Sequence, residues 1–249
     1  KGVVVGLTGQ LILLPLLAFI LAALLAPTPE IAVGAIILAA CPGGVTSNAY
    51  VFAARADVAL SVTLTAIASF ITVLTLPLLT YAALQIFVQQ GQMPALPMLQ
   101  MFQTLALFTV VPVCIGMVIR GLWPTFALRI IEGLRRVTLV VLILIVVATA
   151  VTSYETISEY FFRSSLLVVG LNLLSMAMGY GLARAFRLNV AQRVTLAFEV
   201  GVQNLTLALL VTLTLLGDPS LAITTLLYVA VMPFTAMAYV PISRRMLAR

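Results

Sequence analysis

Long apolar segments separated by short polar or charged stretches run along the whole chain. Eight of them are candidate membrane spans: 3–26, 31–54, 58–87, 98–119, 137–153, 164–183, 194–216 and 221–242. A helix needs about 20 mostly apolar residues to cross a hydrocarbon core about 30 Å thick. The pattern therefore predicts an all-α membrane protein with eight transmembrane helices.

The composition supports a lipid environment. Of 249 residues, 63% are hydrophobic and 8% are charged, whereas a soluble domain carries about 25% charged residues. The formal net charge of +6 would suggest nucleic acid as a partner of a soluble protein. In a membrane protein the positive-inside rule explains the same excess, so we expect the lipid bilayer, and no nucleic acid, as a partner.

The cations predict an orientation. If the eight spans alternate, 12 of the 13 lysines and arginines fall on one side, and only Arg163 lies opposite. That side carries Lys1, Arg55 and the groups at 120–136, 184–193 and 244–249. The opposite loops are 27–30, 89–97, 154–160 and 217–220. We expect a multi-pass membrane protein with both ends of this chain in the cytoplasm.

The two halves of the chain are related by inversion. Spans one to three begin on the cytoplasmic side and spans six to eight on the opposite side, which is the plan of the inverted repeats in secondary transporters. The middle span of each triplet carries a polar cluster, CPGGVTSN at 41–48 and EVGVQN at 199–204. We therefore expect an inverted-repeat secondary transporter.

Pro42, Gly43 and Gly44 predict a break in the second span, because proline removes a backbone donor and glycine adds backbone freedom. A packing kink, common in membrane helices, is the structural alternative. The side chains that follow at 46–48, TSN, offer oxygen ligands of the kind that hard cations prefer. They favour a functional interpretation.

Glu199 is the acidic residue flanked on both sides by long apolar stretches. A carboxylate inside a membrane is usually paired or bound to a cation. Alternatively Glu199 reaches toward the interface, since Arg193 lies only about 9 Å earlier along a helix. Gln203 shares its helix face one turn on, and Gly201 between them allows the helix to open. These neighbours favour a cation site.

The remaining polar residues do not indicate catalysis. Gln10, Ser61 and Thr65 are by spacing alone interhelical or self-bonding residues. Cys41 and Cys114 form no CxxC pair, and histidine is absent, so zinc chemistry and histidine catalysis lose support. No nucleotide-binding loop motif is present. We therefore expect no enzyme.

Three stretches are similar to the bile acid:sodium symporter family, and to its bacterial members in particular: 29–48, 56–65 and 198–204. The resemblance implies the ten-helix inverted-repeat fold of the family, with two discontinuous helices that cross, in a bacterial inner membrane. It divides the chain into core-domain residues 1–97 and 161–249 and panel-domain residues 98–160. The family's first two helices would be missing upstream, since the chain begins on Lys1 rather than Met.

The resemblance also implies two co-transported sodium ions and a substrate site. By motif position the first sodium site comprises Ser47, Asn48, Ser61, Thr65 and Glu199. The second comprises Gln10, Glu199, Gln203 and the backbone carbonyls of Val200 and Val202. Substrate would contact Val45, Thr46 and Asn204, with Val45 standing where family members often have threonine.

The expected function is sodium-coupled symport of a small organic anion by alternating access. A sodium-independent carrier or channel of the same fold is an alternative. An arsenite-type exporter would need a functional cysteine, for which Cys41 is a weak candidate, and an intramembrane enzyme would need a nucleophile and a base. The sequence leaves the anion open between bile-acid-like and other carboxylates.

Overall fold

The computed structural model describes the backbone of residues 1–88, 98–152 and 154–248. Within α8 (Pro124–Thr152) and the first turns of α9 (Tyr154–Ala185) only some side chains are described. Every regular element in these ranges is a helix. The loop expected at 89–97 lies outside the described residues.

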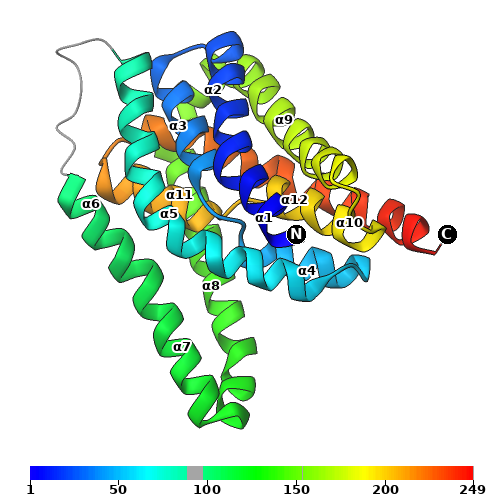
Figure 1. The fold of residues 1–249 in the computed structure, drawn as a ribbon. Coiled ribbons are helices and arrows are strands. Elements are labelled where there is room, and N and C mark those ends of the chain that lie inside the picture. The colour runs from blue at the N-terminus through cyan, green and yellow to red at the C-terminus, as the bar shows by residue number, and fades with distance from the viewer. Residues whose placement is uncertain (89–97, 153, 249) are drawn as a thin grey trace.

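The first and third spans form long helices that pass through the molecule (Figure 1). The first consists of α1 (Gly2–Thr8), a π-helical segment η1 (Gly9–Leu13) and α2 (Leu14–Leu25). The third is α5 (Val58–Phe87), which begins where the Asp57 carboxylate accepts a hydrogen bond from the Leu60 amide at 3.0 Å. Such a cap pairs one of the donors that a helix start leaves free.

The second and seventh spans are both broken. The second consists of α3 (Pro29–Ala40) and α4 (Val45–Ala54), so the predicted interruption at Pro42 is present. The seventh consists of α10 (Val190–Gly201), α11 (Leu205–Leu209) and the π-helical η3 (Leu210–Leu215). The helix does open after Gly201. The last span, η4 (Pro219–Ala222) with α12 (Ile223–Leu247), crosses behind both breaks.

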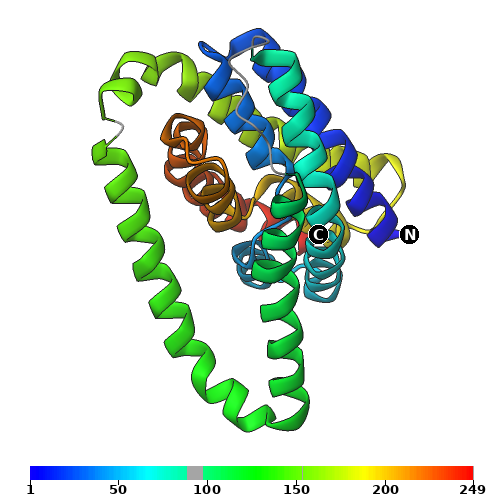
Figure 2. The same cartoon turned by 90° about the vertical axis from the view of Figure 1, so that its left-hand side faces the viewer.

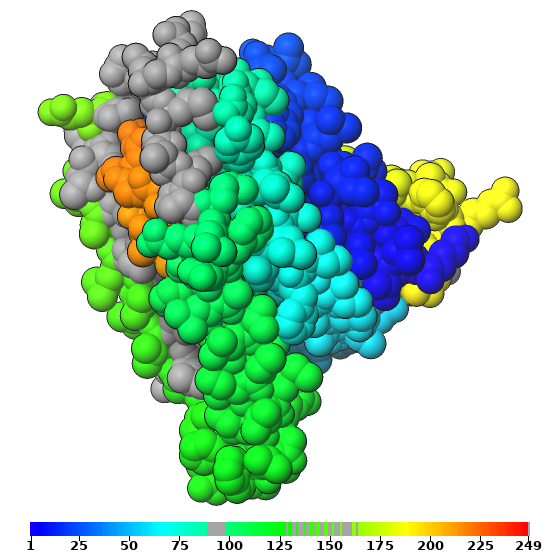
Figure 3. All heavy atoms as spheres, turned by 60° about the vertical axis from the view of Figure 1, so that its left-hand side comes forward, coloured from blue at the N-terminus to red at the C-terminus, as the bar shows by residue number. Residues whose placement is uncertain are grey.

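The central helices form a hairpin that projects from the rest (Figures 1 and 2). One arm is α6 (Met98–Leu105), η2 (Ala106–Val110) and α7 (Val111–Leu122), and the other is α8. In Figure 3 the first arm lies along α5 and then extends beyond the other helices. None of the residues of α7 is buried, so α7 exposes its apolar side chains to its surroundings.

Two expected loops are wrong. Residues 124–136 belong to α8, and residues 154–160 belong to α9. Both stretches contain charged residues, which led to their interpretation as loops between spans. However, leucine, arginine and glutamate are good helix formers, and Pro124 stands at the first position of α8, where proline is well tolerated. Charge alone does not end a helix.

Five helices in the described residues are long and apolar enough to cross a membrane: Gly2–Leu25, Val58–Phe87, Met98–Leu122, Ser164–Ala185 and Pro219–Leu247. The second and seventh predicted spans fall short because their breaks divide each into two short helices. The fifth predicted span lies within α8. The largest buried cluster of apolar side chains centres on α3, of which every residue from Ile31 to Ala40 is buried.

Candidate functional site

The two breaks cross and bind each other through their backbones. Gly43 and Gln203 form an antiparallel bridge. The amide of Gly44 donates to the carbonyl of Val202 at 3.2 Å, and the amide of Asn204 donates to the carbonyl of Pro42 at 3.0 Å. Unwound backbone at membrane depth is tolerated only where its polar groups are satisfied. Each break thus supplies hydrogen-bond partners for the other.

Glycine at positions 43 and 44 leaves room for the groups that meet at the crossing. A Cβ atom at Gly43 would lie 2.8 Å from Oε2 of Glu199 and 2.9 Å from Nε2 of Gln10. At Gly44 it would lie 3.0 Å from the carbonyl oxygen of Gln203. The glycines therefore allow the first break to approach both the second break and the buried polar groups beside it.

Glu199 lies at the centre of the crossing and is fully buried. The hydroxyls of Ser47 and Ser61 each donate to its Oε1 at 2.5 Å, and the hydroxyl of Thr65 donates to its Oε2 at 3.1 Å. These donors come from α4 and α5. Hydrogen bonds to a charged acceptor are about twice as strong as neutral ones, so the carboxylate ties α10 to both helices.

Asn48 completes this first group. Its Oδ1 lies 2.6 Å from the Ser61 hydroxyl oxygen, as an alternative acceptor for that proton, and the Ser47 hydroxyl likewise lies 2.7 Å from the Gly44 carbonyl. The structure thus brings together all five residues predicted for the first sodium site. They present a carboxylate, an amide oxygen and hydroxyls, which are the ligand types of hard cations.

The second group contains unpaired oxygens. Nε2 of Gln10 donates to the Glu199 carbonyl at 3.2 Å, and Nε2 of Gln203 donates to the Val200 carbonyl at 2.7 Å. Oε1 of each glutamine is buried, and neither has a hydrogen-bond partner among the described residues. Such atoms are uncommon in native proteins. Two buried amide oxygens without donors are ligands of the kind that hard cations prefer.

Gln10 reaches this position from a π-helical segment, which the sequence did not predict. Gln10 is the second residue of η1 and is 1% exposed. Single π-helical turns inside α-helices occur frequently at functional sites. The alternative that Gln10 merely bonds between helices is compatible with its hydrogen bond, but does not account for its unpaired oxygen.

The residues predicted to contact substrate lie at the edge of the crossing. Val45 is 79% exposed, and Thr46 is also exposed. Val45 and Thr46 are the first two residues of α4, which begins without a side-chain cap. The first amides of this helix are therefore free to bind an anion. Asn204 differs, because its Oδ1 already accepts from the Leu207 amide at 3.1 Å and caps α11.

A hydrogen-bonded group that supports the second break was not predicted from the sequence. Asn172 of α9 donates from Nδ2 to the carbonyl of Gly201 and to the hydroxyl of Tyr228, both at 3.0 Å. Tyr228 of α12 donates to the same carbonyl at 2.8 Å, and Thr235 donates to Oδ1 of Asn172 at 2.6 Å. These bonds hold the last carbonyl before the second break. Asn172 is the one amide side chain in the apolar run 164–183, a signal that could have found it.

The cysteines lie outside the polar site. Cys41 is buried, and its thiol donates to the Ile37 carbonyl at 3.2 Å. Cys114 is exposed on α7. Within the described residues no group of three or more histidine, cysteine, aspartate or glutamate side chains is arranged to hold a metal ion. The site is instead built from neutral oxygens around one carboxylate.

Long apolar helices around a buried crossing of two broken helices define a multi-pass membrane protein of the transporter class. Residues 1–160 match the sodium bile acid symporter family. The chain belongs to this family, as the sequence predicted, and the family is one of transporters rather than enzymes. The match includes five of the predicted sodium-site residues: Gln10, Ser47, Asn48, Ser61 and Thr65.

Three curated relatives are similar to most of this chain. An uncharacterized sodium-dependent transporter of Bacillus subtilis is 29% identical over 206 residues, which are 81% of this chain and 61% of the relative. The P3 protein of Bos taurus is 30% identical over 84% of this chain and 43% of its own length. The human ileal sodium/bile acid cotransporter is 29% identical over 82% and 58%. The chain therefore spans about half the length of these relatives.

Proposed function

We propose that this protein couples the transport of a small organic anion to sodium. The observation that carries the proposal is the crossing of the two breaks, where the buried Glu199 carboxylate lies among hydroxyls and two glutamine oxygens lack partners. Relatives described as sodium-dependent or as sodium/bile acid cotransporters support the same activity. Sodium is the cargo that this set of oxygens fits.

The first sodium ion would bind the Glu199 carboxylate where the hydroxyl groups now donate hydrogen bonds to it. Hydroxyl groups rotate and can present lone pairs as readily as they donate. With sodium bound, Ser47, Ser61 and Thr65 would turn their oxygens to the ion, and Asn48 would add its carbonyl. The carboxylate neutralises the ion's charge, which lowers the cost of holding it away from water.

The second sodium ion would lie between the two glutamines. Among the described residues Oε1 of Gln10 and Oε1 of Gln203 have no hydrogen-bond partner, and the carbonyls of Val200 and Val202 lie on either side of Gly201, where α10 ends. The second site shares Glu199 with the first. Occupation of both sites would tie span one, span two and span seven together.

The anion would bind at the start of α4. The Val45 and Thr46 amides lie at the N-terminus of α4, where the helix dipole favours negative charge. Nδ2 of Asn204 is a further donor. The described helices place no lysine or arginine at this crossing, so the bound sodium ions would supply the positive charge. This makes anion binding depend on sodium, which is the basis of symport.

Transport would use the ten-helix, inverted-repeat architecture of alternating-access carriers, of which this chain supplies eight spans. Residues 1–97 and 161–249 would form the core domain, and residues 98–160 would belong to the panel against which the core rocks. The projecting hairpin of α7 and α8 supports a separate panel (Figure 2). We place both ends of this chain in the cytoplasm of a bacterial cell.

The substitution Glu199→Gln tests sodium coupling. It keeps the size of the side chain but removes the charge shared by both sites. We expect sodium-driven anion uptake into proteoliposomes to decrease about 100-fold, which corresponds to a loss of about 3 kcal/mol. Glu30→Gln, in the first turn of α3 outside the site, is the matched control and should transport normally.

Undiminished sodium-dependent uptake by Glu199→Gln would contradict the proposal. Uptake by the unmodified protein without a sodium gradient would instead favour a sodium-independent carrier or channel. The anion is identified by the rise in melting temperature that steroid and short-chain carboxylates cause with and without sodium. We expect stabilisation by the transported anion only when sodium is present.

A further inference from the structure

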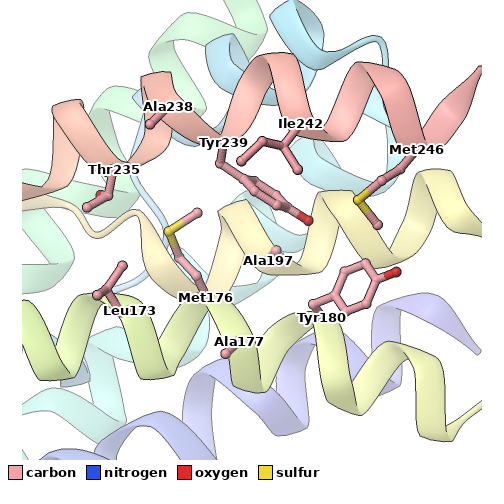
Figure 4. A pocket seen from close by; sticks show the side chains of 10 residues that line it. All are labelled: Leu173, Met176, Ala177, Tyr180, Ala197, Thr235, Ala238, Tyr239, Ile242 and Met246. Carbon is pink, nitrogen blue, oxygen red and sulfur yellow. The ribbon is translucent and has the colours of Figure 1, made fainter.

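An open apolar groove lies between α9, α10 and α12, and the helix α10 that carries Glu199 forms part of its lining (Figure 4). Its volume is about 570 Å³, within the 300–1,000 Å³ of typical ligand sites. Leu173, Ala177 and Tyr180 line one wall, and Tyr239, Ile242 and Met246 line the opposite one. The lining is apolar apart from a few hydroxyls.

Two arginines follow the lining residues along the sequence of α9 and α12. Leu173, Ala177, Tyr180 and Arg184 follow one another on one face of α9 at helical spacing, and Arg245 lies one turn beyond Ile242 on α12. The two helices run in the same direction in Figure 4, so both arginines stand at the same end. Both are exposed, and within the described residues neither side chain has a hydrogen-bond or ion-pair partner.

Neighbouring charges at this end are already engaged. Arg193 donates to the Leu188 carbonyl at 2.7 Å, and Arg244 donates to the Ala53 carbonyl at 2.7 Å. The carboxylate of Asp57 caps α5 through the Leu60 amide. Arg184 and Arg245, which continue the faces of α9 and α12 that line the groove, make no such side-chain bond within the described residues and are available for a negatively charged ligand.

The groove has the length of one lipid leaflet. Along α12 its lining extends from Thr235 to Met246, about 16 Å at 1.5 Å per residue, which is about half of the roughly 30 Å hydrocarbon core. We propose that it binds an anionic phospholipid, with one acyl chain along the apolar walls and the phosphate between Arg184 and Arg245. Basic pockets between transmembrane helices recognise such headgroups.

The groove also touches the supports of the second break. Thr235 lines it and donates to Asn172, which holds the Gly201 carbonyl. The Tyr239 ring lies 5.2 Å from the ring of Phe198, the neighbour of Glu199. A bound acyl chain would therefore pack against residues that position α10.

Lipid binding to the complete protein tests this proposal without sodium or substrate, and so independently of the transport function. Native mass spectrometry would count bound palmitoyl-oleoyl phosphatidylglycerol and its neutral phosphatidylcholine counterpart. In R184Q/R245Q we expect phosphatidylglycerol affinity to decrease about 30-fold, roughly fivefold for each cation. The double variant R120Q/R129Q removes the same charge from exposed positions on α7 and α8, and should bind normally.

Filling the groove separates it from general charge attraction. Ala177→Trp should reduce the binding of both lipids at least tenfold, whereas Leu174→Trp, on another exposed face of α9, should not. Equal affinity for the two lipids, unchanged phosphatidylglycerol binding by R184Q/R245Q, or unchanged binding by Ala177→Trp would each overturn the proposal.

Discussion

The two breaks that cross at Glu199 are formed in different ways. The first contains Pro42, Gly43 and Gly44, residues that interrupt a helix wherever they occur in it. The second consists of residues 202–204, VQN, which contain no proline and follow a single glycine, Gly201, at the end of α10. Its backbone is held open by the bridge to Gly43 and by Asn172 and Tyr228 on the Gly201 carbonyl. One break is encoded locally and the other depends on tertiary contacts.

The difference has a consequence for the site. Glu199 precedes the second break, but its partners Ser47 and Ser61 follow the first break along the chain. A shift of the tertiary-supported break would therefore move the carboxylate away from its hydroxyls. The locally encoded break provides a stable frame against which α10 is positioned.

Asn172→Leu should have the largest effect on stability. It removes bonds to Gly201, Tyr228 and Thr235 inside a buried region, and leaves polar groups there unpaired. We expect the free energy of unfolding to decrease by about 3 kcal/mol, measured by denaturation in detergent without sodium. Tyr228→Phe, which leaves Asn172 in place, should cost about 1 kcal/mol. Equal losses would show that the network does not centre on Asn172.

Gly43→Ala should act on the site rather than on the fold as a whole. Its Cβ would displace the side chains of Glu199 and Gln10, an overpacking cost of about 1–3 kcal/mol. We expect sodium affinity, followed by thermal stabilisation, to decrease about 10- to 100-fold. Gly170→Ala is the control, because a Cβ there meets nothing within 4 Å. A normal sodium response in Gly43→Ala would contradict the close approach.

Pro42→Ala should have the smallest effect. The glycines and both hydrogen bonds between the two breaks remain, so the first break should persist. Stability decreases mainly because the unfolded chain gains conformational freedom. We expect a decrease of about 0.4–1 kcal/mol in unfolding free energy, with sodium-dependent uptake unchanged. A larger loss would mean that proline itself maintains the first break.

Several features of the fold and site were predictable because they follow from local chemistry. Apolar length predicted the spans, Pro42 predicted the first break, and the motifs around Ser47, Asp57 and Glu199 predicted the family, which is confirmed. The loops expected at 124–136 and 154–160 were wrong, because charged residues are compatible with a helix that continues beyond the apolar core. The two sodium sites and the substrate site stay predictions. The structure gives the positions of the residues predicted for them.

The sequence by itself determined the membrane environment, the helical class and the first break, since each depends on hydrophobicity or on backbone chemistry within a few residues. Only the tertiary structure decided that Gln10 enters the site from a π-helical turn, that Asn172 and Tyr228 support the second break, and that two glutamine oxygens are left unpaired. These features depend on contacts between segments far apart in the chain. The spacing of residues along a sequence does not say how close such segments lie in space.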